Sequence, residues 1–170
     1  MKEDLLINPL KPGLKISETG NKAKFLLYLI KHKFRIPVTF ILPANLYYDY
    51  LQDKESFLER LRSEIRALPE KPYAIRSSAK SEDTEEYTYA GQFQTVTNVT
   101  GVDNVLNAVL DVWNSAFLIK ETEYHKKISN KTSGCAVIIQ EMIFSKLAGV
   151  SFSKNPITNQ DEIIIEAVEG

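Results

Sequence analysis

An arginine followed by two serines is the most chemically suggestive feature of this 170-residue chain. Arg76, Ser77 and Ser78 come directly after a short apolar run, residues 73–75, which predicts a strand. A hydroxyl-rich segment follows and leads into an alternating run, residues 93–99, which predicts a second strand. An arginine fork beside the N–H groups of a serine loop would bind an anion such as phosphate. The alternative from these residues alone is an exposed hairpin loop with an ordinary surface arginine.

A lysine at the start of a predicted helix is a second candidate for binding an anion. Residues 20–23 begin a helical pattern, and Lys22 stands in its first turn. The helix dipole mildly disfavours a cation there, whereas a helix N-terminus and a lysine together attract anions. A solvated surface lysine is the alternative. The apolar residues of this pattern share one helix face: Phe25, Leu26, Leu29 and Ile30.

Polar side chains interrupt two of the later apolar runs. Gln140 and Glu141 fall within residues 136–143, and Glu166 falls within residues 163–168. Both runs resemble buried strands, in which an unpaired charge would be costly, so these groups need partners. A neighbouring lysine or arginine, the edge of a ligand or a metal ion would serve. For Glu166, Mg²⁺ ligation and structural pairing both stay open.

Several classes of function are poorly supported. His32 and His125 have no serine, cysteine or metal-ligand cluster at useful spacing, and neither a Gly-x-Gly-x-x-Gly nor a Walker-type loop occurs. A net charge of -1 argues against a general nucleic-acid binder, and no apolar window is long enough for a membrane span. The single cysteine, Cys135, cannot form an intramolecular disulfide, and it adjoins an apolar run. We therefore expect a buried structural thiol and a cytoplasmic protein.

The predicted elements that must position these residues come in the order helix, strand, helix, two strands, helix and three strands. Asp53 is a plausible N-cap of the second helix, which Pro69 ends, and Asp103 can cap the third. Because the strands come in groups rather than alternating with helices, an α+β fold with mostly antiparallel sheet is favoured. The predicted strands outside residues 73–99 cover residues 37–42, 136–143, 147–153 and 163–168.

Five segments of the chain resemble signatures of phosphoenolpyruvate synthase and pyruvate phosphate dikinase. The central segment contains Arg-Ser-Ser-Ala, Glu-Asp, Tyr-Ala-Gly-Gln and Thr at the family's spacing. The others are Gly-Asn-Lys-Ala with a later Ile-Pro-Val, Val-Trp-Asn-Ser-x-Phe, Val-Ile-Ile-Gln-Glu-Met, and Gly-Val-x-Phe-Ser-x-Asn-Pro-Ile-Thr. In chain order they fall at residues 20–23 with 36–38, 76–95, 112–124, 137–142 and 149–158. The resemblance covers residues 16–170.

The resemblance implies an ATP-grasp-like, two-lobed nucleotide-binding domain, here truncated at its C-terminal end. Residues 1–19 would be a lead-in segment, residues 20–134 the N-terminal lobe and residues 135–170 the start of the second lobe. Motif matching gives the following roles: Lys22 and Arg76 as catalytic cations that hold the ATP phosphates, Thr95 beside them, Gln140, Glu141 and Met142 along the adenine, and Glu166 as a Mg²⁺ ligand.

The resemblance further implies that Mg-ATP phosphorylates a histidine on a separate domain, which passes the phosphoryl group to pyruvate on a third domain. The expected protein is thus the N-terminal part of the ATP-binding domain of such a kinase, with paired acceptors of the pyruvate and water or phosphate type. The expected partners are ATP and those two domains, with neither nucleic acid nor membrane, and a homodimer stays open. We expect the 170-residue chain to be inactive alone, because the family's remaining nucleotide residues, its phosphohistidine domain and its pyruvate-binding barrel lie beyond Gly170.

Two alternatives keep the same fold. One is a rifamycin- or glucan-type phosphotransferase, which shares the nucleotide motifs but uses another acceptor. The other is a non-catalytic module, which Glu85 and Glu86 motivate because they add negative charge near the proposed phosphates. Further departures from the family pattern are Tyr87 in the same loop, Tyr89 for phenylalanine and Lys120 for arginine.

Overall fold

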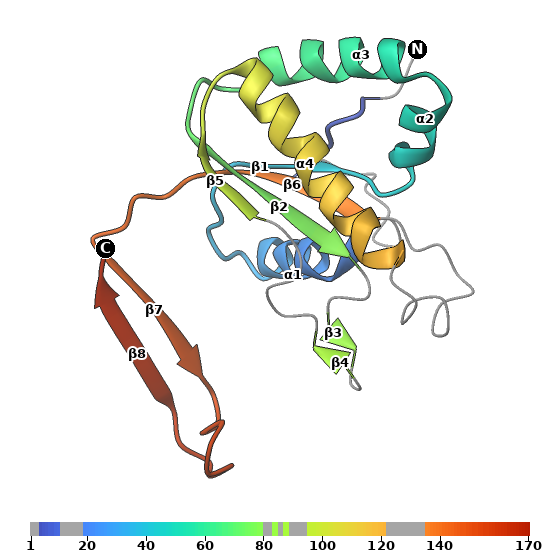
Figure 1. Ribbon diagram of the computed structural model, residues 1–170. Helices are drawn as coiled ribbons and strands as arrows, with labels where there is room; N and C mark the ends of the chain where they lie inside the picture. Colours follow the sequence, from blue (N-terminus) through green and yellow to red (C-terminus); the bar gives the residue numbers. More distant parts are fainter. Residues whose placement is uncertain (1–3, 11–18, 80–82, 85–86, 89–94, 122–134) are drawn as a thin grey trace.

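The centre of the computed structural model is a four-stranded antiparallel sheet with the strand order β1-β6-β2-β5 (Figure 1). The structure describes residues 4–10, 19–79, 83–84, 87–88, 95–121 and 135–170. The sheet strands are β1 (Thr39–Leu42), β2 (Tyr73–Ala79), β5 (Thr95–Val99) and β6 (Cys135–Glu141). The helices are α1 (Gly20–Lys31), α2 (Leu46–Gln52), α3 (Lys54–Arg66) and α4 (Val102–Glu121). Two separate hairpins pair β3 (Asp83–Thr84) with β4 (Tyr87–Thr88), and β7 (Leu147–Phe152) with β8 (Ile164–Glu169).

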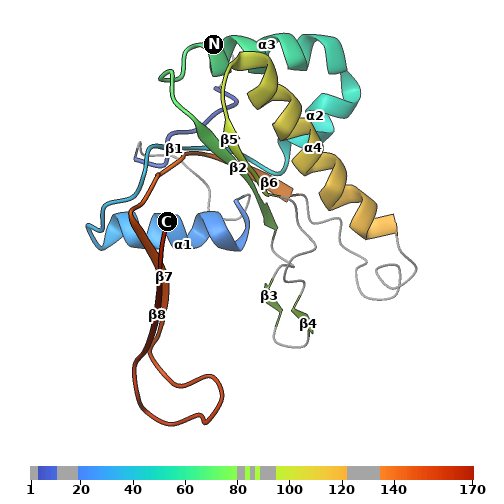
Figure 2. The ribbon, with the colours of Figure 1, turned by 60° about the vertical axis from the view of Figure 1, so that its left-hand side comes forward.

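Helices cover both faces of the sheet. Helices α2, α3 and α4 lie on one face, and α1 lies on the other (Figures 1 and 2). The larger core lies on the three-helix side, where the fully buried ring of Trp113 packs against the rings of Tyr47, Tyr50 and Phe57. A smaller core joins Ala23 of α1 to the sheet. The sheet is therefore the middle layer of three, which confirms a mixed α and β fold with antiparallel strands.

Strand β6 is the most deeply buried strand of the sheet, with six of its seven residues buried. It lies between β1 and β2, although it follows both in the sequence. Cys135, its first residue, is buried as predicted, and the Sγ atom donates to the Ala136 carbonyl. Because helices cover both of its faces, the strand is an almost continuous apolar run rather than an alternating one.

The segment Ser77–Ala79 lies within strand β2, so the prediction of a loop there is wrong. Ser77, Ser78 and Ala79 stand opposite Val137, Ala136 and Cys135 of β6, and both serines are fully buried. Ser78 contacts Ala23 of α1 and Ala79 packs against Ala116 of α4, so helices cover both faces of this end of the strand and bury its hydroxyl-rich segment. These serine N–H groups therefore do not form an exposed anion-binding loop.

Two of the predicted helix starts have different outcomes. Asp53 does cap α3, since its side chain accepts a hydrogen bond from the Ser56 N–H at 3.1 Å. Asp103 does not cap α4, because that helix begins at Val102, one residue after Gly101. Gly101 has a φ of 82° and turns the chain from β5 into the helix, which places Asp103 inside the first turn.

The core-facing side of α1 differs from the prediction. Phe25 is 63% exposed, and the buried residues of the helix are Gly20 and Ala23, with Leu26 packed beside them. Small residues lie toward the sheet because the helix backbone approaches β2 closely. The apolar spacing correctly indicated a helix, but it did not identify which of its faces is buried.

Two segments behave differently from the body of the fold. Leu5 and Leu6, within the expected lead-in segment, are buried in the larger core, and their N–H groups donate to the Glu64 carboxylate at 3.0 and 2.8 Å. The β7–β8 hairpin, in contrast, projects from the sheet in both views (Figures 1 and 2). Its residues are almost all exposed, so the prediction that Glu166 interrupts a buried strand is wrong.

None of the described helices is long and apolar enough to cross a lipid bilayer.

Candidate functional site

Polar side chains on the α1 side of the sheet form a connected row. The Arg76 guanidinium, which is half-buried, donates from Nη1 to Gln140 Oε1 at 3.4 Å. Gln140 Nε2 donates to Thr39 Oγ1 at 3.0 Å, and that hydroxyl donates to the Pro37 carbonyl at 2.8 Å. Thr95 lies directly opposite Arg76 on β5. Three of the predicted site residues, Arg76, Gln140 and Thr95, are thus close together.

The register of the sheet shows which face carries this row. Arg76 is opposite Ile138 of β6, and Ile138 packs against Ala23 of α1. Directly opposed residues in an antiparallel pair point to the same face. Arg76 therefore lies on the side of α1, away from the larger core.

Ser78 attaches the start of α1 to strand β2. Its Oγ accepts a hydrogen bond from the Ala23 N–H at 3.0 Å and donates to the Thr19 carbonyl at 2.7 Å. In a regular helix Ala23 would donate directly to Thr19, so the hydroxyl is inserted into the first helical hydrogen bond. Thr19 makes no side-chain cap of its own, and Ser78 supplies one from another element.

The first turn of α1 lies directly against the end of β2. Gly20 has a φ of 71°, and a Cβ there would lie 2.1 Å from the Ser78 carbonyl oxygen, so only glycine fits. Lys22 stands in the same turn and is half-buried. The turn that carries Lys22 therefore contacts β2 two residues after Arg76, which brings the two predicted phosphate ligands into one region.

Several contacts fix the end of β6, where the chain leaves the sheet. Lys71 Nζ donates to Glu141 Oε1 at 2.6 Å, and the Val38 N–H lies 3.4 Å from Glu141 Oε2. The backbone N–H groups of Glu141 and Met142 donate to the carbonyls of Val38 and Pro72 at 2.8 and 2.9 Å. The hydrogen bond from Lys71 holds the pKa of Glu141 below its usual value. Lys71 is thus the partner of the Glu141 carboxylate. A neighbouring cation was one of the partners predicted for this residue from its place in an apolar run.

Glu166 is not part of this group. It lies on β8 opposite Val150, in the hairpin that stands apart from the sheet (Figure 1). Within the part of the chain that the structure describes, no three histidine, cysteine, aspartate or glutamate side chains gather as a metal site would require. Glu85, Glu86 and His125 lie outside the described residues.

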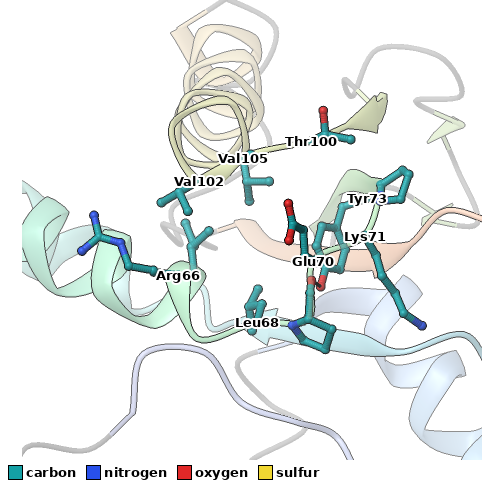
Figure 3. Close-up of a pocket in the computed structure, with 12 residues that line it drawn as sticks. Arg66, Leu68, Glu70, Lys71, Tyr73, Thr100, Val102 and Val105 are labelled. Carbon is teal, nitrogen blue, oxygen red and sulfur yellow. Dashed lines mark hydrogen bonds between the residues drawn. The ribbon is translucent and has the colours of Figure 1, made fainter.

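A cavity of about 410 Å³ opens elsewhere, between the end of α3, the start of β2 and the start of α4 (Figure 3). Its walls are mostly apolar and include Leu68, Val102 and Val105. The Arg66 side chain points away from its centre, whereas the Glu70 carboxylate points toward it. Because a carboxylate that points into it would repel phosphate, this cavity suits ATP less well than the row around Arg76.

The sequence did not reveal the contacts of three residues that organise the site. Thr39, Lys71 and Gly20 each act on a residue that is distant in the chain: Gln140, Glu141 and Ser78. A polar residue at the head of the apolar strand β1 was the only local signal for Thr39. Nothing local distinguishes Lys71 from other surface lysines, because its role depends on the neighbouring strand.

Comparison with known proteins gives one matching family and several relatives. The family model described as pyruvate phosphate dikinase, AMP/ATP-binding domain, matches residues 53–170. YvkC, an uncharacterized phosphotransferase of Bacillus subtilis, is 30% identical over 175 residues, which is 89% of this chain and 21% of YvkC. A probable phosphoenolpyruvate synthase of Archaeoglobus fulgidus is 37% identical over 57% of this chain and 13% of its own length. The phosphoenolpyruvate synthase of Aeropyrum pernix is 37% identical over 57% of this chain and 12% of its own length.

Proposed function

The chain belongs to the family of pyruvate phosphate dikinase AMP/ATP-binding domains, and from this membership we propose that it begins an ATP-grasp-like domain of a larger phosphotransferase. The chain spans about a fifth or less of the length of these curated relatives. In this proposal residues 20–141, with the packed segment 4–10, form the N-terminal lobe, because β6 lies between β1 and β2 in its sheet rather than in a second lobe that starts at residue 135. The β7–β8 hairpin would belong to the second lobe.

We place the ATP phosphates beside Arg76, Lys22 and Thr95. The observation that carries this proposal is the Arg76 guanidinium, which is half-buried on a rigid strand and held by Gln140 close to the first turn of α1. Phosphoryl transfer depends mainly on positioning and on cations that neutralise developing charge. A preorganised arginine and a lysine at a helix N-terminus supply both.

The adenine would lie along Gln140, Glu141 and Met142. Lys71 already holds the Glu141 carboxylate, so we propose that Glu141 contacts the adenine through its backbone. Mg²⁺ is typically held by one or two carboxylates together with the substrate phosphates, so Glu166 fits as a single protein ligand. For Glu166 to serve, the hairpin, which projects on the α1 side of the sheet, must come close to Arg76 (Figures 1 and 2).

The proposed reaction is transfer of a phosphoryl group from Mg-ATP to a histidine on a separate domain, and from there to pyruvate, with water or phosphate as the paired acceptor. We place this activity in the cytoplasm, as a single cysteine favours. A phosphotransferase with another acceptor, such as a rifamycin or a glucan, is the second candidate. YvkC, whose match covers 89% of the chain, is described only as a phosphotransferase, a term that both candidates satisfy. A non-catalytic module and a homodimer are further alternatives.

Substitution of Arg76 and Lys22 tests the proposal in the whole protein that contains this chain. We expect Arg76→Ala and Lys22→Ala each to lower ATP-dependent phosphohistidine formation by about 10²–10³-fold. Arg66→Ala is a matched control, since Arg66 is an exposed arginine on the opposite side of the sheet. Near wild-type labelling in both site variants would refute the proposal. Calorimetric titration with Mg-ATP tests the non-catalytic alternative, which an absence of binding would favour.

A further inference from the structure

We propose that Thr39 sets the orientation of the Arg76 guanidinium through the side-chain amide of Gln140. Thr39 is then a positioning residue for the ATP phosphates, although it touches neither Arg76 nor ATP. This inference rests on the proposed function, in which Arg76 binds phosphate.

The hydrogen bonds between these residues can run in only one direction. A threonine hydroxyl has a single proton, and that of Thr39 goes to the Pro37 carbonyl at 2.8 Å. Thr39 can therefore only accept a hydrogen bond from Gln140, which must turn its NH₂ group toward Thr39, at 3.0 Å. The amide oxygen then faces Arg76, whose Nη1 lies 3.4 Å away. The Thr39 hydroxyl, as an acceptor, thus supports the one orientation of the amide that offers its oxygen to the guanidinium.

Because the residues are buried, the orientation of the Gln140 amide matters for Arg76. Thr39 is 4% exposed and Gln140 is 8% exposed, so water cannot easily replace a lost partner. If the amide turned around, its NH₂ group would face the Arg76 N–H groups, donor against donor. The guanidinium would then lose its acceptor in the sheet and become free to turn away from an anion.

The sheet register holds the row in place. Thr39 and Gln140 are directly opposite residues of β1 and β6, and Arg76 stands opposite Ile138, two residues before Gln140. The row therefore crosses three hydrogen-bonded strands, and its spacing does not depend on loop geometry. Such a rigid support suits a side chain that must meet a charged ligand with little reorganisation.

Calorimetric titration of the whole protein with Mg-ATP tests the inference. Thr39→Val keeps the shape of the side chain and removes its acceptor, and we expect it to weaken Mg-ATP binding about tenfold. Thr39→Ser keeps the hydroxyl and should recover most of the affinity. Thr100→Val, at an exposed threonine in the turn before α4, is the matched control for the loss of a hydroxyl.

A double-mutant cycle with Arg76→Ala separates positioning from a general structural effect. In the Arg76→Ala background, Thr39→Val should weaken binding no further, because the side chain that it positions is gone. Thr39→Ala, which also removes the hydroxyl acceptor, should behave in the same way and serves if Thr39→Val fails to fold. Equal losses in both backgrounds, or no loss from Thr39→Val in the protein that retains Arg76, would overturn the inference. If Arg76→Ala itself leaves Mg-ATP binding unchanged, the proposed function fails instead.

Discussion

Replacing Gly20 by alanine should separate helix α1 from strand β2. Two costs add at this position. A residue with a Cβ pays about 1–2 kcal/mol in the left-handed conformation that a φ of 71° imposes. The new Cβ would also lie 2.1 Å from the Ser78 carbonyl oxygen and 2.4 Å from its carbon. Those atoms are backbone in a paired strand, so relief requires movement of the helix or the strand, at about 1–3 kcal/mol.

Gly101 provides a matched control, because it isolates the first of these costs. Its φ is 82°, and the nearest atom to a Cβ there would be Asn104 Nδ2 at 3.9 Å, an ordinary contact distance. We expect Gly101→Ala to lower the free energy of unfolding by about 1–2 kcal/mol, and Gly20→Ala to lower it by about 2–5 kcal/mol.

Urea denaturation of the two variants, followed by the fluorescence of the single tryptophan, Trp113, measures both values. In the whole protein, Gly20→Ala should also weaken Mg-ATP binding, since the turn that carries Lys22 moves with it. Equal losses of stability in the two variants would refute the reasoning, because the overlap with Ser78 would then have no cost.

Two further predictions concern other contacts. The Lys71 bond lowers the pKa of Glu141 in the folded state, so its stabilisation is present above the ordinary glutamate pKa of about 4.5 and is lost as the pH falls through the lowered value. Lys71→Met should therefore lower the melting temperature at pH 7 and have little effect once the pH is below the lowered pKa of Glu141; a difference independent of pH would contradict this. Trp113→Phe removes the bond from Nε1 to the Cys135 carbonyl at 3.1 Å and should cost about 2 kcal/mol in urea denaturation followed by circular dichroism; a loss below about 0.5 kcal/mol would mean that the bond contributes little.

Local patterns predicted those elements whose evidence lies within a few neighbouring residues. The N-cap at Asp53 and the apolar stripe after it indicated α3, and an apolar run that contains one polar pair indicated β6. The place of β6 between β1 and β2 could not be predicted in this way, because it depends on contacts between segments far apart in the chain. The buried face of α1 could not be predicted either, since close packing at Gly20 selects small residues over the larger Phe25.

The candidate site shows the same division between local and distant information. Motif spacing singled out Arg76 and Gln140, and the structure brings their side chains together. Motif spacing could not reveal Thr39, because the direction of a chain of hydrogen bonds appears only when the partners and the burial of each group are known. The serines after Arg76 were predicted to form a phosphate-binding loop, whereas Ser78 is a buried link between two elements.

That link changes how the proposed phosphate ligands should behave. Arg76 and Ser78 lie on one strand, and Ser78 holds the helical turn that carries Lys22. The two cations should therefore keep a fixed separation, as parts of one rigid unit that is in place before ATP arrives. Glu166 lies on a hairpin that stands apart from this unit, and it would join only when the hairpin approaches. Under the proposed function, binding of the phosphates is then preorganised within the sheet, and completion of the Mg²⁺ site is the step that requires movement.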